Sequence, residues 1–353
     1  MSTAPTPLVH IVVLNYNGMR FLKECFDSLL ATTYQNVELV LLDNNSTDES
    51  VGYISKNYPS TRIIQTGING GYSLAYNVAF DQCKGTYLVM LNNDVKVRSG
   101  WLEPMVAACE ADHNIAAAQP KLLSMHDTQM FEYAGACGGF LDKYGYPFAR
   151  GRVFFTLEKD TGQYDDMERI FWATGAAMFI RISALKHSGN LDKDFVHHME
   201  EIDLCWRMNL AGYKLVVTPK SIVEHYGGAT IIPDSYRKTY WNHRNSIFML
   251  YKNLERKNLL PLLIRHILLD EVASFFYLFN FKFAKVWAVQ AAHYWILTHL
   301  GMLRRKRRET QAMRKVSDTD IFPMVYQHSI AFRYFLYGEK TFNQIMKKHD
   351  ENK

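Results

Sequence analysis

The sequence predicts an α/β fold, a Rossmann-like, mostly parallel sheet flanked by helices and followed by a helical C-terminal extension. Runs of consecutive apolar residues predict strands that are buried on both faces, as in parallel sheets. Segments whose apolar residues recur at helical spacing separate these runs. Across 353 residues, 48% hydrophobic and 21% charged residues are the balance of a globular chain with a large core. Together these observations favour a sheet with helices on both sides.

The first third of the chain alternates strands with helices. In residues 19–34 the apolar side chains form one helical face, and residues 70–85 predict a second helix that Gly85 closes. This alternation is typical of a parallel sheet, because parallel neighbours need a crossover connection. The predicted strands are the apolar runs at residues 8–17, 37–43, 61–67 and 86–94.

The middle of the chain is less regular. Residues 119–169 are rich in glycine and aromatic turns, and they predict an irregular insertion over one end of the sheet. After about Tyr236 the composition becomes helical and aromatic. Between these regions we expect a strand, a helix and a last strand, at residues 170–185, 200–213 and 214–228.

Short polar side chains gather where three of the predicted strands end. In an open parallel sheet, ligands bind beyond the carboxyl ends of the strands. Any one of these groups is ordinary turn chemistry, but three together predict a polar rim on one edge of the sheet. The three groups are Asn15-Tyr16-Asn17, the run from Asp43 to Asp48, and Asn92-Asn93-Asp94.

A rim of carboxylates and amides suits a hard divalent cation and a nucleotide. Mg²⁺ and Mn²⁺ sites use one or two carboxylates together with substrate phosphates, and Asp94 is placed for such a role, with Asn92 on the same side of the strand. Asp43 suits a hydrogen bond to a ribose or a base. Asp48 fits helix capping as well as ligand binding. The glycine pair at residues 70–71 fits either a turn or an anion site at a helix start.

Composition disfavours several other classes of protein. A formal charge of +5 is too small to indicate nucleic acid binding. Five scattered cysteines without a CxxC pair favour reduced thiols in the cytoplasm over disulfides or a zinc site. The N-terminus lacks the basic start and long apolar region of a signal peptide. No GxGxxG follows the first strand, which disfavours a dehydrogenase.

Six blocks, in this order, resemble the inverting glycosyltransferases of family 2, which have the GT-A fold. The similarity covers about residues 8–250, and the most similar subgroup is the rhamnosyltransferase-like enzymes of bacterial surface polysaccharides. Each block is short, so the ordered set carries the resemblance. The blocks read "VVLNYNG", "LVLLDNNSTDES", "NGGYSLAYN", "LNNDV", "TGAAMFIRISAL" and "GNLDKDFVHHMEEIDLCWRMNLAGY".

The resemblance implies a binding site for a nucleotide-sugar donor. It places Tyr16 and Asn17 in the base pocket, Asp43 on the base, and Arg244 near the diphosphate. The donor-binding residues that it implies are Asn15, Tyr16, Asn17, Asp43, Asn45, Asp48, Asn69, Asn77, Asn92, Asn93, Arg244 and Asn245.

The resemblance also implies a metal site and a catalytic base. Asp94 and His225 would hold Mg²⁺ or Mn²⁺, although Asn92 replaces the first aspartate of the family's Asp-x-Asp motif. Glu201 stands where the family has a catalytic aspartate, and Glu200 is the second candidate for the general base. Acidic residues in the first turn of a helix also complement its dipole, so a purely structural role is the alternative.

The C-terminal region predicts an amphipathic helical part. Residues 259–303 are apolar but interrupted by charges, so they suit a membrane interface, or packing on the core or on a second subunit, better than a spanning helix. The basic run from Arg304 to Arg308 favours the surface of an anionic membrane. A polar stripe interrupts the apolar helix at His266, Asp270 and Ser274.

The resemblance, together with the basic C-terminal region, implies an inverting, metal-dependent glycosyltransferase of surface polysaccharide synthesis, at the inner face of the cytoplasmic membrane. Its donor would carry dTDP, UDP or GDP, and its acceptor would be a saccharide or a lipid-linked saccharide. The alternative is a catalytically silent sugar-nucleotide or polysaccharide-binding protein of the same fold. We expect a catalytic domain at 1–250, with a nucleotide-binding half at 1–118 and an acceptor half at 119–250, and a helical region at 251–353.

Overall fold

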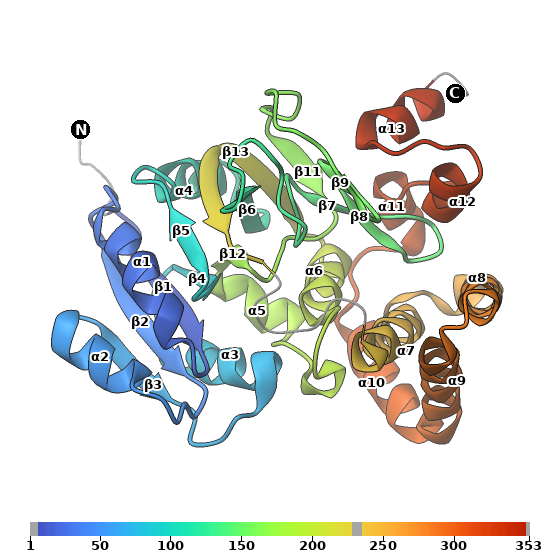
Figure 1. Cartoon of the computed structure of the whole chain (residues 1–353), viewed down its shortest axis with the longest axis horizontal. Helices are drawn as coiled ribbons and strands as arrows, with labels where there is room; N and C mark the ends of the chain where they lie inside the picture. The colour runs from blue at the N-terminus through green and yellow to red at the C-terminus, as the bar shows by residue number, and fades with distance from the viewer. Residues whose placement is uncertain (1–5, 228–234, 351–353) are drawn as a thin grey trace.

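The computed structural model describes residues 6–227 and 235–350, and the side chains of these residues up to 346. A nine-stranded sheet forms the centre of the described part (Figure 1). Four neighbouring strands are parallel, in the order β3-β2-β1-β4, and each lies within a predicted apolar run. They are β1 (Val9–Asn15), β2 (Val37–Asp43), β3 (Arg62–Gln65) and β4 (Tyr87–Asn92).

The other half of the sheet is mixed. Strand β12 lies antiparallel between β4 and β6, β13 runs parallel to β6, and β11 and β5 pair antiparallel with β13. The last pairing matters for the site, because it sets Val95 directly opposite His225. The bounds are β5 (Val95–Val97), β6 (Ile115–Ser124), β11 (Glu168–Ile170), β12 (Ala177–Arg181) and β13 (Lys214–His225).

Helices cover both faces of the sheet, as the apolar strands predict. Val12 of β1 belongs to one buried cluster with α3, while Ile11 and Val13 belong to the other with α1 and α4. The predicted α/β fold with a mostly parallel sheet is confirmed. The helices of this part are α1 (Met19–Leu30), α2 (Ser50–Asn57), α3 (Gly71–Gln82), α4 (Leu102–Ala111), α5 (Ile182–Ser188) and α6 (Glu200–Leu210).

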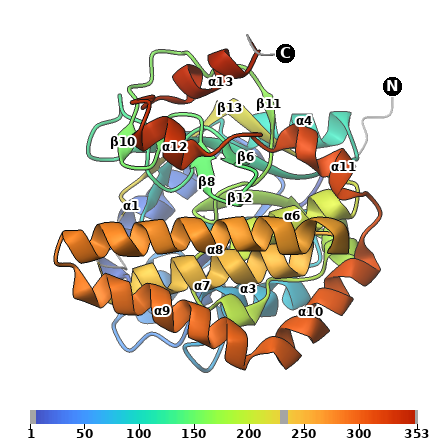
Figure 2. The ribbon, with the colours of Figure 1, turned by 90° about the vertical axis from the view of Figure 1, so that its right-hand side faces the viewer.

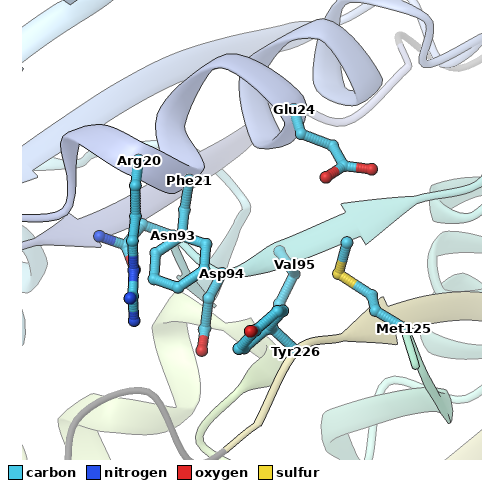
Figure 3. A pocket seen from close by; sticks show the side chains of 8 residues that line it. All are labelled: Arg20, Phe21, Glu24, Asn93, Asp94, Val95, Met125 and Tyr226. Atoms are coloured by element: carbon cyan, nitrogen blue, oxygen red, sulfur yellow. The ribbon is translucent and has the colours of Figure 1, made fainter.

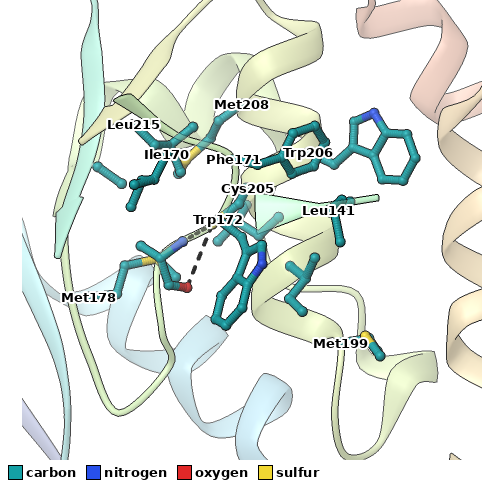
Figure 4. Close-up of a cluster of buried hydrophobic side chains, with 14 of the residues drawn as sticks. Leu141, Ile170, Phe171, Trp172, Met178, Met199, Cys205, Trp206, Met208 and Leu215 are labelled. Carbon is teal, nitrogen blue, oxygen red and sulfur yellow. Dashed lines mark hydrogen bonds between the residues drawn. The ribbon is translucent and has the colours of Figure 1, made fainter. Parts of the chain in front are cut away.

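Helix α6 is anchored in the larger of these clusters. Its Cys205 accepts a hydrogen bond at Sγ from the backbone N–H of Ala173 at 3.4 Å, and its Trp206 packs edge-to-face on Phe171 (Figure 4). Ten of its eleven residues are buried. The first turn of α6, which carries the predicted catalytic glutamates, is therefore held rigidly against the sheet.

The prediction of an irregular insertion at residues 119–169 is wrong in part. Strand β6 continues to Ser124, and a separate four-stranded antiparallel sheet follows it. Its strands have only two or three residues, too few to produce an apolar periodicity. Likewise residues 170–185 are not one strand, because α5 begins at Ile182. The small sheet consists of β7 (Gly139–Leu141), β8 (Pro147–Ala149), β9 (Arg152–Val153) and β10 (Thr156–Leu157).

The predicted C-terminal extension is helical and lies on the side of the molecule opposite β3 (Figure 1). Figure 2 looks onto its helices. Helix α7 runs across residue 250, where we expect the catalytic domain to end, and it contacts α8, α9 and α10. The division into two domains at this residue stays a prediction. No helix among the described residues is long and apolar enough to cross a bilayer. The helices are α7 (Tyr236–Asn253), α8 (Arg256–Phe279), α9 (Phe283–Thr298), α10 (Leu300–Met313), α11 (Asp318–Ile321), α12 (Ile330–Phe335) and α13 (Phe342–Asp350).

The polar stripe of α8 faces the protein interior. Asp270 is fully buried, and its carboxylate accepts a hydrogen bond from the Tyr146 hydroxyl at 2.9 Å. The same carboxylate lies 2.8 Å from Nδ1 of His243 in α7 and 3.4 Å from Nε2 of His293 in α9. His266, one turn earlier, lies against the backbone carbonyl of Tyr144 at 2.6 Å. A buried carboxylate with several partners fixes the rotation of the helix about its axis.

Candidate active site

The polar ends of three strands meet at one point of the sheet edge. Asn93 donates from Nδ2 to Asn15 Oδ1 at 2.8 Å, and Asn15 Nδ2 lies 3.1 Å from Ser46 Oγ and 3.5 Å from Asp43 Oδ1. A Cβ at Gly18 would overlap the side chains of Asn93 and Asn15, so only glycine fits there. The structure thus brings together the three groups that follow β1, β2 and β4.

The loop after β2 is folded onto the end of β1. Asn17 Oδ1 accepts hydrogen bonds from the backbone N–H of Thr47 at 2.7 Å and of Asp48 at 3.3 Å, in a left-handed conformation with φ 49°. Asp43 is buried and accepts from the backbone N–H of Ser46 at 3.2 Å. Tyr16, 49% exposed, and Asn45 face solvent beside this loop.

Three further predicted donor residues have backbone partners. Asp48 accepts from the backbone N–H groups of Met19 at 3.2 Å and Ser50 at 3.1 Å. Although burial opposes it, hydrogen bonding from Ser50 lowers the pKa of Asp48. Asn69, just before α3, accepts at Oδ1 from the backbone N–H of Gly71 at 3.3 Å and from Asn44 Nδ2 at 2.9 Å. Asn77 exchanges two hydrogen bonds with the backbone of Leu191. These contacts support the loops around the site.

The predicted metal ligands lie side by side. Nε2 of His225 is 3.1 Å from Oδ1 of Asp94, and Nδ2 of Asn92 is 3.4 Å from the same nitrogen. Both Asp94 and His225 are more than nine-tenths buried. The pairing of β5 with the end of β13 produces this contact, since it sets Val95 opposite His225.

A third buried side chain, Glu132, forms a row with Asp94 and His225, and it was not predicted from the sequence. Its Oε2 lies 3.3 Å from Nδ1 of His225, on the far side of the ring from Asp94. Burial acts against the imidazolium, but hydrogen bonding and charge from the two carboxylates raise the pKa of His225 to about 10. Glu132 comes from the segment between β6 and β7, where an isolated glutamate between two aromatic residues carries no sequence signal.

The residues present fit a divalent cation that takes some of its ligands from the protein and the others from a substrate. Within residues 6–227 and 235–350, no three His, Cys, Asp or Glu side chains are arranged to hold a metal by themselves. Mg²⁺ and Mn²⁺ commonly take one or two protein ligands and complete their shell with substrate phosphates and water. Asp94 can supply one of those ligands, and His225 can supply the other once its ring has released its proton, because only the neutral imidazole binds a metal.

A pocket of about 220 Å³ opens beside Asp94. Figure 3 shows the Asp94 carboxylate between Arg20 and Tyr226. Neither Arg20 nor Tyr226 was predicted from the sequence, although Arg20 follows the first polar strand end by only three residues. The lining residues are Arg20, Phe21, Glu24, Asn93, Asp94, Val95, Met125 and Tyr226.

Two glutamates form the first turn of α6 near the same edge. Burial raises the pKa of Glu200 to about 8, with a further contribution from the charge of Glu201, and burial raises the pKa of Glu201 to about 7. The Oε2 atom of Glu200 has no hydrogen-bond partner. Glu201 is the more exposed of the two, so it is the one that a substrate can reach.

A short segment before β12 connects these glutamates with the strand ends. The Tyr72 hydroxyl donates to the carbonyl of Gly175 at 2.6 Å, and the carbonyl of Ala176 accepts from the N–H of Asn92 at 3.0 Å. A Cβ on Gly175 would lie 2.7 Å from the Tyr72 hydroxyl oxygen and 3.7 Å from Cβ of Glu201. Glycine therefore leaves room between Tyr72 and Glu201, and Tyr72, like Glu132, Arg20 and Tyr226, was not among the residues predicted from the sequence.

Arg244 and Asn245 hold the loop that leads into α6. Arg244 is buried and donates to the carbonyls of Asp194 at 2.6 Å and Phe195 at 2.7 Å. Asn245 Nδ2 lies within 2.9 Å of the carbonyls of Phe195, His197 and His198. Their polar groups are thus directed at the backbone of this loop, which enters α6 through left-handed residues.

The match to known proteins agrees with this arrangement. Residues 10–187 match the profile of glycosyl transferase family 2. The chain belongs to this family. The N-acetylglucosaminyl-diphospho-decaprenol L-rhamnosyltransferase of Mycobacterium tuberculosis is 24% identical over 261 residues, which cover 69% of this chain and 84% of the relative. The O-antigen biosynthesis protein RfbC of Myxococcus xanthus is 27% identical over 241 residues, which cover 67% of this chain and 19% of RfbC.

Solved structures of glycosyltransferases share the fold. A crystal structure of GalNAc-T7 with UDP, GalNAc and Mn²⁺ aligns with a TM-score of 0.56 at 18% identity, over 71% of this chain and 48% of that chain. The crystal structure of S. aureus TarS aligns with a TM-score of 0.50 at 17% identity, over 74% of this chain and 43% of that chain. The chain thus spans less than half the length of either. These likenesses confirm the predicted GT-A fold.

Proposed function

We propose that this family 2 glycosyltransferase transfers a sugar, with inversion, from a nucleoside diphosphate donor to a saccharide or lipid-linked saccharide acceptor in bacterial surface polysaccharide synthesis. The observation that carries the proposal is the pair Asp94–His225, buried 3.1 Å apart where three polar strand ends meet. The family supplies the reaction class. The two curated relatives, one a rhamnosyltransferase with a lipid diphosphate in its name and one an O-antigen protein, support the acceptor class and the pathway.

In this proposal Asp94 and His225 would hold Mg²⁺ or Mn²⁺ at the donor site. When bound, the cation would supply positive charge where the leaving nucleoside diphosphate becomes more negative. Arg20, which lines the pocket with Asp94, would add a second positive charge there. The loop residues after β1 and β2, among them Tyr16, Asn17 and Asp43, would hold the nucleoside.

Glu201 is the proposed general base. The acceptor hydroxyl must lose its proton while its oxygen attacks the anomeric carbon, so a carboxylate has to lie within hydrogen-bond reach. With its pKa raised to about 7, Glu201 is a better proton acceptor than an ordinary glutamate and is still about half ionised at neutral pH. Glu200, with a pKa of about 8, stays protonated and adds no repelling charge. One displacement of this kind inverts the anomeric configuration.

Arg244 and Asn245 would act through the loop that they support. Because both donate to carbonyls of residues 194–198, we assign them the positioning of α6 and its glutamates, in place of the direct diphosphate contact that the family resemblance implies for Arg244. Rhamnose from a dTDP donor is the proposed sugar, on the strength of the rhamnosyltransferase relative, with UDP- and GDP-linked sugars as the other donors to test. A lipid-linked acceptor would place the enzyme at the cytoplasmic face of a membrane.

The test is release of nucleoside diphosphate from a panel of dTDP-, UDP- and GDP-sugars with Mn²⁺ and a lipid-linked saccharide. We expect turnover with one donor class, and its loss in Glu201→Gln while donor binding is retained. Donor binding without turnover in the unaltered protein, across donors and acceptors, would instead identify a silent binding protein of this fold.

A further inference from the structure

The outer face of the α8–α9 hairpin is apolar and exposed. On α8 six exposed apolar side chains recur at every third or fourth position, which places them on one side of the helix. Beyond the end of α8, Phe281 is 80% exposed and Trp287 of α9 is 71% exposed. Most monomeric proteins avoid a continuous apolar surface of this extent, so a partner is expected to cover it. The α8 stripe consists of Leu260, Ile264, Leu268, Val272, Phe276 and Phe279.

This face cannot be turned inward by a rotation of the helix. The opposite side of α8 is fixed by the buried Asp270, which contacts α7 through His243 and α9 through His293. Leu262, His266 and Ser274 are buried on that same inner side. The outward direction of the apolar stripe is therefore part of the folded structure.

The charges on the hairpin identify the kind of partner. Among residues 256–299, the exposed charged side chains are Arg256, Lys257, Arg265 and Lys282, all positive. The acidic residues of this segment are turned inward or engaged, since Asp270 is buried and Glu271 accepts hydrogen bonds from Gln290 at 3.0 and 3.1 Å. Aromatic and aliphatic side chains among cations match the interface of an anionic bilayer. A symmetric contact with a second copy would instead set cations against cations.

The basic run of α10 is less suited to this role than its sequence predicts. Lys306 forms ion pairs with Asp192 at 2.7 Å and Asp194 at 2.9 Å. Arg307 donates to the carbonyls of Tyr251 and Leu254, both at 2.6 Å. These two cations hold α10 to the loop before α6 and to the end of α7, and so they stabilise the protein itself.

We propose that the α8–α9 hairpin lies in the headgroup region of an anionic lipid bilayer, with the aromatic residues between Phe276 and Trp287 inserted. Figure 2 shows α8 lengthwise across the side of the molecule that would face the bilayer. The hairpin lies in the interface and does not cross it, in line with the lack of a spanning helix in the described chain. The inference rests on the proposed function in one respect only, that the hairpin would hold the candidate active site beside a lipid-linked acceptor.

The test is co-sedimentation of the full-length protein with phosphatidylglycerol-containing vesicles, without substrate, beside neutral phosphatidylcholine vesicles. We expect binding to the anionic vesicles, and a loss of more than about tenfold in the triple variant Phe279→Ser/Phe281→Ser/Trp287→Ser, because three large aromatic side chains would no longer be buried in the bilayer. Phe155→Ser, which alters a 77% exposed aromatic of the small-sheet region, is the matched control and should bind as the unaltered protein does.

Unaltered vesicle binding by the triple variant, or an unaltered protein that stays in the supernatant, would overturn the proposal. The proposal would also be overturned if the unaltered protein were dimeric in solution and the triple variant monomeric, because the hairpin would then be a contact between two copies. Nucleoside diphosphate release with a water-soluble acceptor is measured in parallel. Hairpin-dependent vesicle binding without such release would support the membrane surface and contradict the transfer reaction, so the two failures can be told apart.

Discussion

His225 Nε2 and Asp94 Oδ1 lie 3.1 Å apart, although 131 residues separate them in the chain. The antiparallel pairing of β5 with the end of β13 makes the contact, and Glu132 closes it from the other side of the ring at 3.3 Å. Three side chains from three segments thus form a buried row at the carboxyl end of the sheet. This row and the two glutamates of α6 form the candidate active site.

Glu201→Gln should abolish most of the turnover. The amide keeps the shape of the side chain but cannot accept the proton of the acceptor hydroxyl, so kcat should fall by about a hundredfold to ten-thousandfold. The Kd of the donor, measured by calorimetry in the presence of Mn²⁺, should stay within about twofold, since Glu201 is assigned to the acceptor side. An unchanged kcat would remove Glu201 from the mechanism and leave Glu200 as the candidate base.

The dependence of kcat on pH should report the raised pKa of Glu201. The base must be ionised, and burial raises its pKa to about 7, so activity should decline as the pH falls through about 7. An ordinary glutamate would give the same decline near about 4.3. The measurement is the acid limb of the kcat profile at saturating donor, acceptor and Mn²⁺. An acid limb that stays flat to about pH 5 would contradict the assignment.

Glu200→Gln should stabilise the protein at alkaline pH. The folded state raises the pKa of Glu200 from 4.5 to about 8, so folding favours the protonated form. The free energy of unfolding therefore loses a growing amount as the pH rises from 4.5 through about 8, and glutamine, which cannot ionise, avoids that loss.

Thermal unfolding checks this prediction about Glu200. At about pH 5 the Tm of Glu200→Gln should be close to that of the unaltered protein, and at about pH 8.5 it should be higher by several degrees, because a buried, unpaired carboxylate costs on the order of a few kcal/mol. A difference that is the same at both pH values would mean that the effect comes from packing and is unrelated to ionisation.

Glu132→Gln should weaken the binding of Mn²⁺. A carboxylate behind a ligating histidine fixes the orientation of the ring, and its loss typically costs about tenfold to a hundredfold in metal affinity. The measurement is the Kd of Mn²⁺ by electron paramagnetic resonance, with nucleoside diphosphate present. Glu224→Gln is the matched control, because Glu224 adjoins His225 on β13 but pairs with Arg98 at the surface. Equal Kd values for the two variants would rule out the positioning role of Glu132.

The sequence predicted the sheet and its polar rim better than the surroundings of the rim. Long apolar runs mark β1, β2 and β4, and parallel strands put their carboxyl ends together, so the meeting of Asn15, Asp43 and Asn93 followed from local patterns. The antiparallel β12 and the small sheet depend on long-range pairing of short strands, which leaves no periodicity to recognise.

Candidate site residues that depend on tertiary contacts could not be recognised from the sequence either. Glu132 and Tyr72 reach it only after β6, α3 and the segment before β12 have packed. Arg244 has the residue type of a phosphate ligand, yet the fold directs its guanidinium at two backbone carbonyls. Residue type and motif spacing predict candidates for a site, but the direction of each side chain is set by packing.

A crystal structure with donor nucleotide and Mn²⁺, with anomalous data collected to locate the manganese, tests the candidate metal site most directly. We predict a manganese peak bound by the Asp94 carboxylate and His225 Nε2, with the donor diphosphate completing its shell. A nucleotide bound at the strand ends with manganese elsewhere, or with neither side chain on the ion, would contradict it.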